Sequence, residues 1–157
     1  MAIDIDFTNS ENRFNVRVGG YITYKNKILL EKSSELDFYT FAGGRVKIDE
    51  DTNTAIRREI GEELGLKNIS PKLMYICENH FPWLGKKMNQ LLFIYHIELD
   101  DKQYESLPEG TRIEDSKTER IYWIDKKDIK QHKCLPAFIY DLPKLDVGNI
   151  THHIKIQ

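Results

Sequence analysis

Apolar and polar side chains alternate over residues 13–24. Phe14, Val16 and Val18 alternate there with Asn15 and Arg17, which is the period of a strand with one buried face. A polar turn at residues 25–27 separates this stretch from a second apolar stretch at residues 28–31, so the pattern predicts a β-hairpin. Further strands are predicted at residues 39–42, 71–78, 88–99, 121–124 and 149–156.

The periodicity changes between Asp51 and Gly65. Apolar residues recur there three or four positions apart, which is the spacing of one helix face. Asp51 suits the N-cap because its carboxylate can accept hydrogen bonds from the first turn. Gly65 suits the left-handed residue that ends a helix. The predicted apolar face consists of Ala55, Ile56, Ile60 and Leu64.

The remaining segments are mostly polar. Residues 1–11 are predicted to be a mobile lead-in, residues 79–87 a connection between strands, and residues 100–118 a long polar loop. A helical turn is expected at residues 125–131 and a short helix at residues 135–142. Strands in this mixed order, with one helix after the third strand and another near the end, predict an α+β sandwich.

Three glutamates of the predicted helix, Glu59, Glu62 and Glu63, lie at positions i, i+3 and i+4 and share one face. They repel one another and oppose the negative end of the helix dipole. Arg58 can pair with Glu62, but negative charge remains in excess. Because no cysteine or histidine lies nearby, this oxygen-rich cluster predicts a Mg²⁺ or Mn²⁺ site. For an isolated acidic cluster, a solvated helix face is the alternative.

A pair of glycines, Gly43 and Gly44, precedes the helix. Glycine lets the backbone bend sharply and approach a ligand closely, although a simple turn is the alternative. Arg45 is a candidate to hold a substrate phosphate, or else an exposed arginine without a function. Phe81 and Trp83, in a later connection, are candidates to stack on a nucleobase. Packing over the end of the sheet is the alternative for both aromatic residues.

Residues 44–66 read GRVKIDEDTNTAIRREIGEELGL. This stretch resembles the Nudix box, the signature of hydrolases that act on nucleoside diphosphates linked to another group. Its specified residue types recur by chance about once in 10⁸ starting positions. The family often has proline before the glycine pair, where this chain has Ala42. The signature positions are filled by Gly44, Glu50, Arg58, Glu59, Ile60, Glu62, Glu63, Gly65 and Leu66.

The resemblance implies a Nudix-like α/β/α sandwich around a mixed sheet. It implies Mg²⁺ as the cofactor, with Mn²⁺ as the alternative. It also implies a further acidic ligand or base from the polar segment before residue 120, and a homodimer is consistent with the family. The expected metal ligands are the Gly43 carbonyl, Glu59, Glu62, Glu63 and Glu114, with Glu119 as the alternative to Glu114.

The expected reaction is hydrolysis at phosphorus by attack of water. The candidate catalytic residues are Glu59, Glu62 and Arg58, with Glu59 as ligand or general base and Arg58 orienting a carboxylate. Glu50 supports the site from the loop. The favoured substrate is a nucleoside diphosphate linked to another group, such as ADP-ribose or a nucleotide sugar. The alternatives are a (deoxy)nucleoside triphosphate, as for MutT, and a non-catalytic nucleotide sensor.

The composition is that of an ordinary soluble domain. The chain has 157 residues, with 40% hydrophobic and 31% charged residues, which predicts one domain over residues 1–157. A formal net charge of −2 without a basic block does not favour nucleic-acid binding. No secretory signal or bilayer-spanning stretch is visible. Cys77 and Cys134 are expected to be reduced, in a cytoplasmic protein without a membrane partner.

Overall fold

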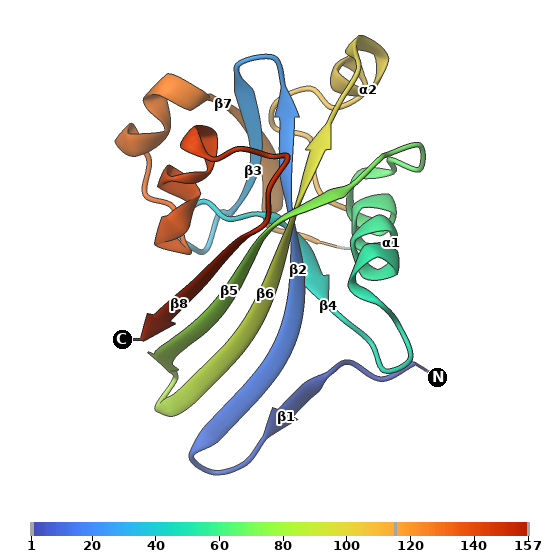
Figure 1. Ribbon diagram of the computed structural model, residues 1–157. Coiled ribbons are helices and arrows are strands. Elements are labelled where there is room, and N and C mark those ends of the chain that lie inside the picture. Colours follow the sequence, from blue (N-terminus) through green and yellow to red (C-terminus); the bar gives the residue numbers. More distant parts are fainter. Residues whose placement is uncertain (1, 115, 157) are drawn as a thin grey trace.

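The computed structural model describes residues 2–114 and 116–156. Its strands are β1 (Asp6–Thr8), β2 (Asn12–Tyr24), β3 (Lys27–Ser33), β4 (Ala42–Arg45), β5 (Lys72–Trp83), β6 (Lys86–Glu98), β7 (Glu119–Asp125) and β8 (Thr151–Ile156). Within these residues the strands form one mixed sheet in the order β7-β3-β2-β6-β5-β8 (Figure 1). The short strands β1 and β4 both pair with β2, which also pairs in parallel with β6. β2 is therefore the strand around which the sheet is built.

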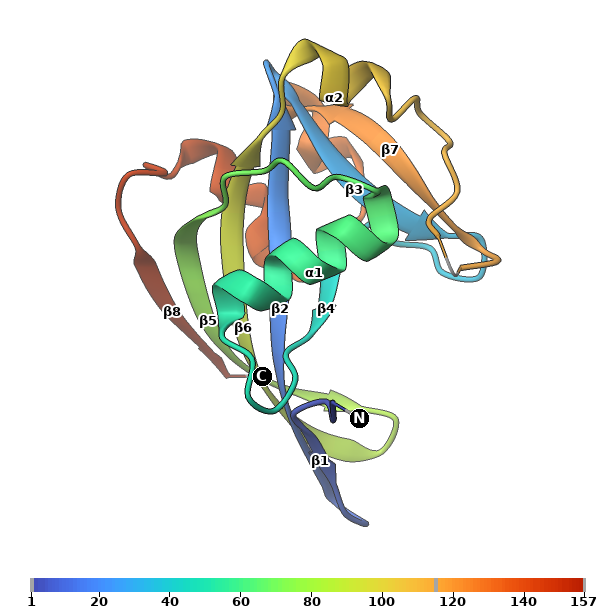
Figure 2. The same cartoon turned by 90° about the vertical axis from the view of Figure 1, so that its right-hand side faces the viewer.

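Helices cover both faces of this sheet, as Figures 1 and 2 show. The helices are α1 (Thr52–Leu64), α2 (Asp101–Glu105) and the 3₁₀ helices η1 (Lys126–Gln131), η2 (Ala137–Tyr140) and η3 (Leu142–Lys144). α1 lies on one face, and the 3₁₀ helices lie on the other. The expected α/β/α arrangement is confirmed. The short helix predicted at residues 135–142 is instead the pair η2 and η3, where Pro143 cannot donate a backbone hydrogen bond.

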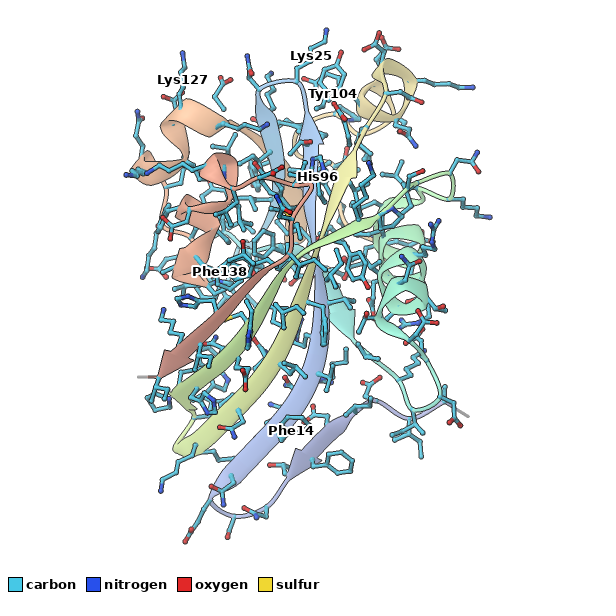
Figure 3. The ribbon with its side chains drawn as sticks, viewed as in Figure 1. Phe14, Lys25, His96, Tyr104, Lys127 and Phe138 are labelled. Carbon is cyan, nitrogen blue, oxygen red and sulfur yellow. The ribbon has the colours of Figure 1, made fainter. Side chains whose placement is uncertain are left out.

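Apolar side chains are buried on both faces of the sheet. On the α1 face, Ile56 and Ile60 are fully buried in one cluster with Val18 of β2. On the opposite face, Phe138 of η2 stacks on Tyr75 with 4.6 Å between the ring centroids, and Figure 3 shows Phe138 on the side away from α1. Burial of its apolar face holds α1 against the sheet and fixes its rotation.

The N-terminal segment, expected to be a mobile lead-in, contributes a strand instead. β1 pairs antiparallel with β2, with Phe7 opposite Phe14. The Ile5 N–H also donates to the Val46 carbonyl at 2.8 Å. The expectation was wrong because a short edge strand with polar side chains shows little alternation, while backbone hydrogen bonds still hold it in the sheet.

The connection predicted at residues 79–87 is a tight hairpin turn. β5 continues through Pro82 to Trp83, and the turn consists of Leu84 and Gly85, both with positive φ. Proline is rare within a central strand, and the predicted strand ended at residue 78. The observed strand β5 continues to Trp83. The candidate stacking residues are therefore strand residues and not loop residues.

The strand predicted at residues 39–42 begins later and includes both glycines. Tyr39 and Thr40 make only isolated bridges, and β4 starts at Ala42. Gly43 has a φ of 149°, and a Cβ atom there would lie 2.1 Å from the Val18 carbonyl oxygen. Glycine is needed at this position because β2 and β4 approach so closely.

The polar segment predicted to be a loop at residues 100–118 begins with the short helix α2. The Asp100 carboxylate accepts a hydrogen bond from the Gln103 N–H at 2.8 Å, and the Gln103 side chain accepts one from the Asp100 N–H at 3.0 Å. This capping box was missed because no apolar stretch follows it. None of the helices in the described residues is long and apolar enough to cross a membrane.

Cys77 and Cys134 are free thiols and both are buried. Burial raises the pKa of each thiol to about 11. Both thiols therefore stay protonated at neutral pH, which makes them poor nucleophiles.

Candidate active site

The box helix α1 begins and ends at the predicted residues. The Asp51 carboxylate accepts a hydrogen bond from the Thr54 N–H at 2.8 Å, which confirms the N-cap. Gly65 has a φ of 69° and donates its N–H to the Gly61 carbonyl at 3.0 Å, which confirms the helix end. With the apolar face against the sheet, the glutamates emerge along the flank of α1 that lies beside β4.

Arg58 connects the carboxylates of this flank. Its Nε and Nη2 donate to the two oxygens of Glu50 at 2.6 and 3.0 Å. Its Nη1 donates to Glu59 at 2.7 Å and to Glu62 at 3.3 Å. The double hydrogen bond from Arg58 lowers the pKa of Glu50. Arg58 and Glu50 therefore occupy the orienting and supporting positions expected for them, and their catalytic importance remains a prediction.

The glycine pair, Gly43 and Gly44, contacts the carboxylates of Glu63 and Glu59. A Cβ atom on Gly44 would lie 2.4 Å from the carboxyl carbon of Glu59, so this close contact requires glycine. The Gly43 N–H donates to Glu63 Oε2 at 3.1 Å. The sequence pointed to the Gly43 carbonyl, whereas the N–H is the group seen in contact with α1. Metal binding by the carbonyl remains a prediction.

Glu31 of β3, which the sequence did not single out, lies against Glu63. It is 4% exposed, and its Oε1 has no hydrogen-bond partner among the described residues. Burial raises the pKa of Glu63 to about 7, and the Glu59 charge also raises it. Burial and the Glu63 charge raise the pKa of Glu31 well above its ordinary value. The one available signal was a charged residue at the end of the strand predicted at residues 28–31.

Two arginines meet opposite each other on β2 and β4. Arg45, the candidate phosphate ligand, pairs with Asp6 at 2.9 Å and with Asp4 at 3.4 Å. Arg17 is its partner in register, and burial, followed by the Arg45 charge, lowers the pKa of Arg17. The box glutamates are the negative charges that act on Arg17, and no ion pair holds it within the described residues. Arg17 is thus the arginine of this pair on which the box glutamates act, and its polar position in an alternating strand gave no sign of this.

The two acidic candidates near β7 are placed differently. Glu114 is exposed, and its backbone N–H donates to the Glu63 carbonyl at 3.3 Å. Glu119 begins β7, and its negative charge contributes to the raised pKa of both Glu31 and Glu63. The arrangement therefore favours Glu119 over Glu114 as the carboxylate that acts on the box.

The donor groups beside α1 suit a hard divalent cation. The carboxylates there belong to Glu31, Glu50, Glu59, Glu62 and Glu63, and they outnumber the guanidinium groups. Within residues 2–114 and 116–156, no three acidic, histidine or cysteine side chains converge on one point. The carboxylates of Glu50, Glu59 and Glu62 are instead paired with Arg58, and that of Glu63 with the Gly43 N–H. The unpaired Glu31 oxygen nevertheless fits a cation, because positive charge would satisfy it and offset the repulsion.

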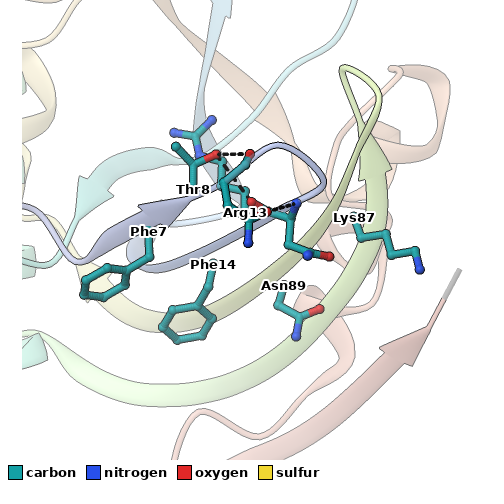
Figure 4. Close-up of a pocket in the computed structure, with 8 residues that line it drawn as sticks. Phe7, Thr8, Arg13, Phe14, Lys87 and Asn89 are labelled. Atoms are coloured by element: carbon teal, nitrogen blue, oxygen red, sulfur yellow. Dashed lines mark hydrogen bonds between the residues drawn. The ribbon is translucent and has the colours of Figure 1, made fainter.

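Two hollows lie beside β1, away from α1. Their volumes are about 520 and 530 Å³. Figure 4 shows the first hollow with the rings of Phe7 and Phe14 side by side. Trp83, which is 45% exposed, lines the second hollow. Neither hollow is lined by a box residue, so the carboxylate cluster beside α1 and the hollows are separate features.

Phe81 lies on the same sheet face as Arg17. It pairs with Met88, and Met88 pairs with Arg13 of β2. Residues in register point to the same face, and Arg17 follows Arg13 by an even number of positions along β2. Trp83 shares this face at the tip of the hairpin. Of the two stacking candidates, Phe81 is the one nearer to Arg17 along the sheet.

Comparison with known proteins agrees with this geometry. The family model of the NUDIX domain matches residues 13–142. The chain belongs to the Nudix family. The matched range contains the whole box and most of the sheet, but not β1 or β8. A Nudix hydrolase is thus an enzyme of the pyrophosphohydrolase type, and members of the family generally use divalent metals.

Similar proteins include MutT-like enzymes. The chain is 31% identical over 106 residues to the 8-oxo-dGTP diphosphatase of Buchnera aphidicola subsp. Schizaphis graminum, covering 57% of this chain and 81% of the relative. The MutT protein of Bacillus halodurans superposes with a TM-score of 0.67 at 16% identity, covering 88% and 89% of the two chains. The MutT protein of Methanosarcina mazei Go1 superposes with a TM-score of 0.59 at 20% identity, covering 87% of this chain and 94% of that chain. The solved structures support the Nudix fold.

Proposed function

We propose that the protein hydrolyses a phosphoanhydride bond of a nucleotide with the help of a divalent cation, Mg²⁺ or Mn²⁺. The observation that carries this proposal is the seating of Glu59 and Glu63 on the glycine pair, next to Arg58. A domain that only bound nucleotides would not need a buried carboxylate such as Glu63, whose pKa is raised first by burial and then also by the Glu59 charge.

The chain's own residues supply orientation and proton transfer. Arg58 orients the Glu59 carboxylate through a charge-assisted hydrogen bond of 2.7 Å. Glu59 accepts the proton of the attacking water, and Glu62 and Glu63 supply oxygen ligands. When bound, the cation neutralises the phosphate oxygens and makes a water molecule more acidic. The anhydride bond breaks at phosphorus and gives two phosphorylated products.

Arg17 and Phe81 are the proposed substrate-binding residues of the sheet. Arg17 lies opposite Arg45, is acted on by the negative charges of Glu59 and Glu63, and has no ion pair among the described residues. It can therefore bind a phosphate group, whereas Arg45 is engaged by Asp6. The ring of Phe81, on the same face, can stack on the nucleobase.

The proposed substrate is a (deoxy)nucleoside triphosphate, with oxidised guanine nucleotides included. The 31% identity to an 8-oxo-dGTP diphosphatase supports this choice. The sequence alone favoured ADP-ribose or a nucleotide sugar, which becomes the competing outcome.

A hydrolysis panel tests the proposal. Purified protein is given common and 8-oxo (d)NTPs, ADP-ribose, ADP-glucose and diadenosine polyphosphates, each with Mg²⁺, Mn²⁺ or EDTA, beside the Glu63→Gln variant. We expect metal-dependent turnover of the triphosphates that is lost in the variant. Turnover of ADP-ribose or ADP-glucose alone would overturn the substrate class. A rise in melting temperature with nucleotide but without turnover would indicate a nucleotide sensor and would contradict the proposed enzymatic function.

A further inference from the structure

Glu31 is the only charged side chain among the buried polar residues in the described part of the chain. Its backbone lies in β3 opposite Ile121 of β7 and is bridged to Thr40. Leu29, on the same face of β3, is completely buried, so an aliphatic residue would suit position 31. The other buried polar residues are Asn15, Thr23, Ser33 and Asn79, all uncharged.

The surroundings of Glu31 are predominantly negative. The Glu63 carboxyl group lies against it, and Glu119 adds a further negative charge. Arg17 is the positive charge that acts on it. Glu63 is already engaged by the Gly43 N–H at 3.1 Å. The Oε1 atom of Glu31 has no partner among the described residues, although buried carboxylates normally have one.

Two arrangements could offset the repulsion between Glu31 and Glu63. A proton shared by the two carboxyl groups would join one oxygen of each, but it would leave Glu31 Oε1 unpaired. A cation bound by Glu63 could use that oxygen, because hard cations take several oxygen ligands at once. The unpaired buried atom therefore favours the cation.

We propose that Glu31 is an additional oxygen ligand of the divalent cation that Glu63 binds. This inference rests on the proposed function, because it requires a cation at the box. The box contributes its carboxylates from α1, whereas Glu31 comes from β3 of the sheet. A cation held by both residues connects the end of α1 to the sheet, so its binding stabilises the fold as well as the site.

The test measures cation binding without nucleotide. Chelator-treated Glu31→Gln protein is titrated calorimetrically with MgCl₂ and MnCl₂, and its thermal melting is followed with and without each salt. We expect the cation affinity to fall at least about tenfold and the cation-induced rise in Tm to shrink. Without metal, the variant should melt at or above the wild-type temperature, because a repulsive charge has been removed.

Two further variants separate the outcomes. Glu63→Gln should lose cation binding, and Glu35→Gln, at an exposed position, should bind as wild type does. Wild-type affinity in Glu31→Gln beside weakened binding in Glu63→Gln would overturn the role of Glu31 and leave the proposed function standing. A wild-type protein that binds no cation would overturn both. If Glu31→Gln fails to fold, Glu31→Asp replaces it, and unchanged affinity in that shorter side chain overturns the inference.

Discussion

The box region and the β1 end of the sheet present opposite properties. Beside α1, carboxylates are packed against backbone, and Glu59 leaves no room for a side chain at Gly44. Beside β1, hollows of about 520 and 530 Å³ are bordered by exposed aromatic rings. Phe7 is 60% exposed and Phe14 is 39% exposed. The box region concentrates charge in little space, and the β1 end offers space with little excess charge.

This difference shows that hollow volume is a poor guide to the chemistry of this protein. The negative charge beside α1 suits a divalent cation, and a bound cation would in turn neutralise the phosphate oxygens of an anhydride. The sheet face with Arg17 and Phe81 connects the two regions. We therefore expect substitutions to affect catalysis and substrate binding most at the box and least at the tip of the β5–β6 hairpin.

The largest effect is expected for Glu63→Gln. The substitution keeps the size of the side chain but removes a cation ligand, which is worth several kcal/mol of transition-state stabilisation, or about 10³-fold in kcat. The measurement is kcat with Mg²⁺, together with a melting curve. Glu35→Gln is the matched control. A folded Glu63→Gln variant with the wild-type rate would remove Glu63 from the mechanism.

Gly44→Ala should come next. The added Cβ would lie 2.4 Å from the Glu59 carboxyl carbon, so Glu59 must move. Because the Cβ atom meets the flexible end of the Glu59 side chain, we expect a loss of only about 1 kcal/mol or less in the free energy of unfolding, but a fall in kcat of about 10²-fold, because the general base is displaced. Urea denaturation and initial rates measure the two effects. Full activity in this variant would show that Glu59 need not touch the backbone of β4.

Arg17→Ala should raise KM about 10–100-fold with a smaller change in kcat. The reason is the loss of a charge-assisted hydrogen bond to a phosphate, worth about 1.5–3 kcal/mol. Arg120→Ala, on an exposed part of β7, is the control. Steady-state kinetics over a range of substrate concentrations separates KM from kcat. An unchanged KM would return Arg45 to the role of phosphate ligand.

Phe81→Ala should raise KM about tenfold, since stacking on a base contributes about 1–3 kcal/mol. Trp83→Ala, at the tip of the hairpin, should change KM less than about twofold. The ratio of the two effects tests how far the substrate extends from the box. A larger effect at Trp83 would place the nucleobase in the hollow beside β1.

The smallest effect, and one of opposite sign, is expected for Gly61→Ala. A Cβ atom there would lie 3.7 Å from the Leu66 carbonyl oxygen, an ordinary contact. Alanine favours the helix by about 0.5–1 kcal/mol, so the free energy of unfolding should increase by about that amount while kcat stays unchanged. Chemical denaturation measures it. A destabilised variant would show that the protein does not accommodate a methyl group beside the Leu66 carbonyl.

The sequence by itself determined the box helix. Its ends depend on Asp51 and Gly65, whose effects on the backbone are local. The spacing of Arg58 and the glutamates is also local, because side chains three or four positions apart on a helix must lie together. The motif, the Nudix family and the oxygen-rich donor set were therefore accessible without a structure.

The tertiary structure alone decided which distant residues meet the box. Glu31 and Arg17 reach it through the pairing of β3 and β2, and register between strands is set by packing and not by local spacing. The same holds for β1, which an edge position leaves without a clear pattern. It also explains why Arg45, which lies within the box sequence, is instead held by Asp6 of β1. The local sequence pattern thus indicated the chemistry of the site, whereas strand pairing between distant segments determined which other residues surround it.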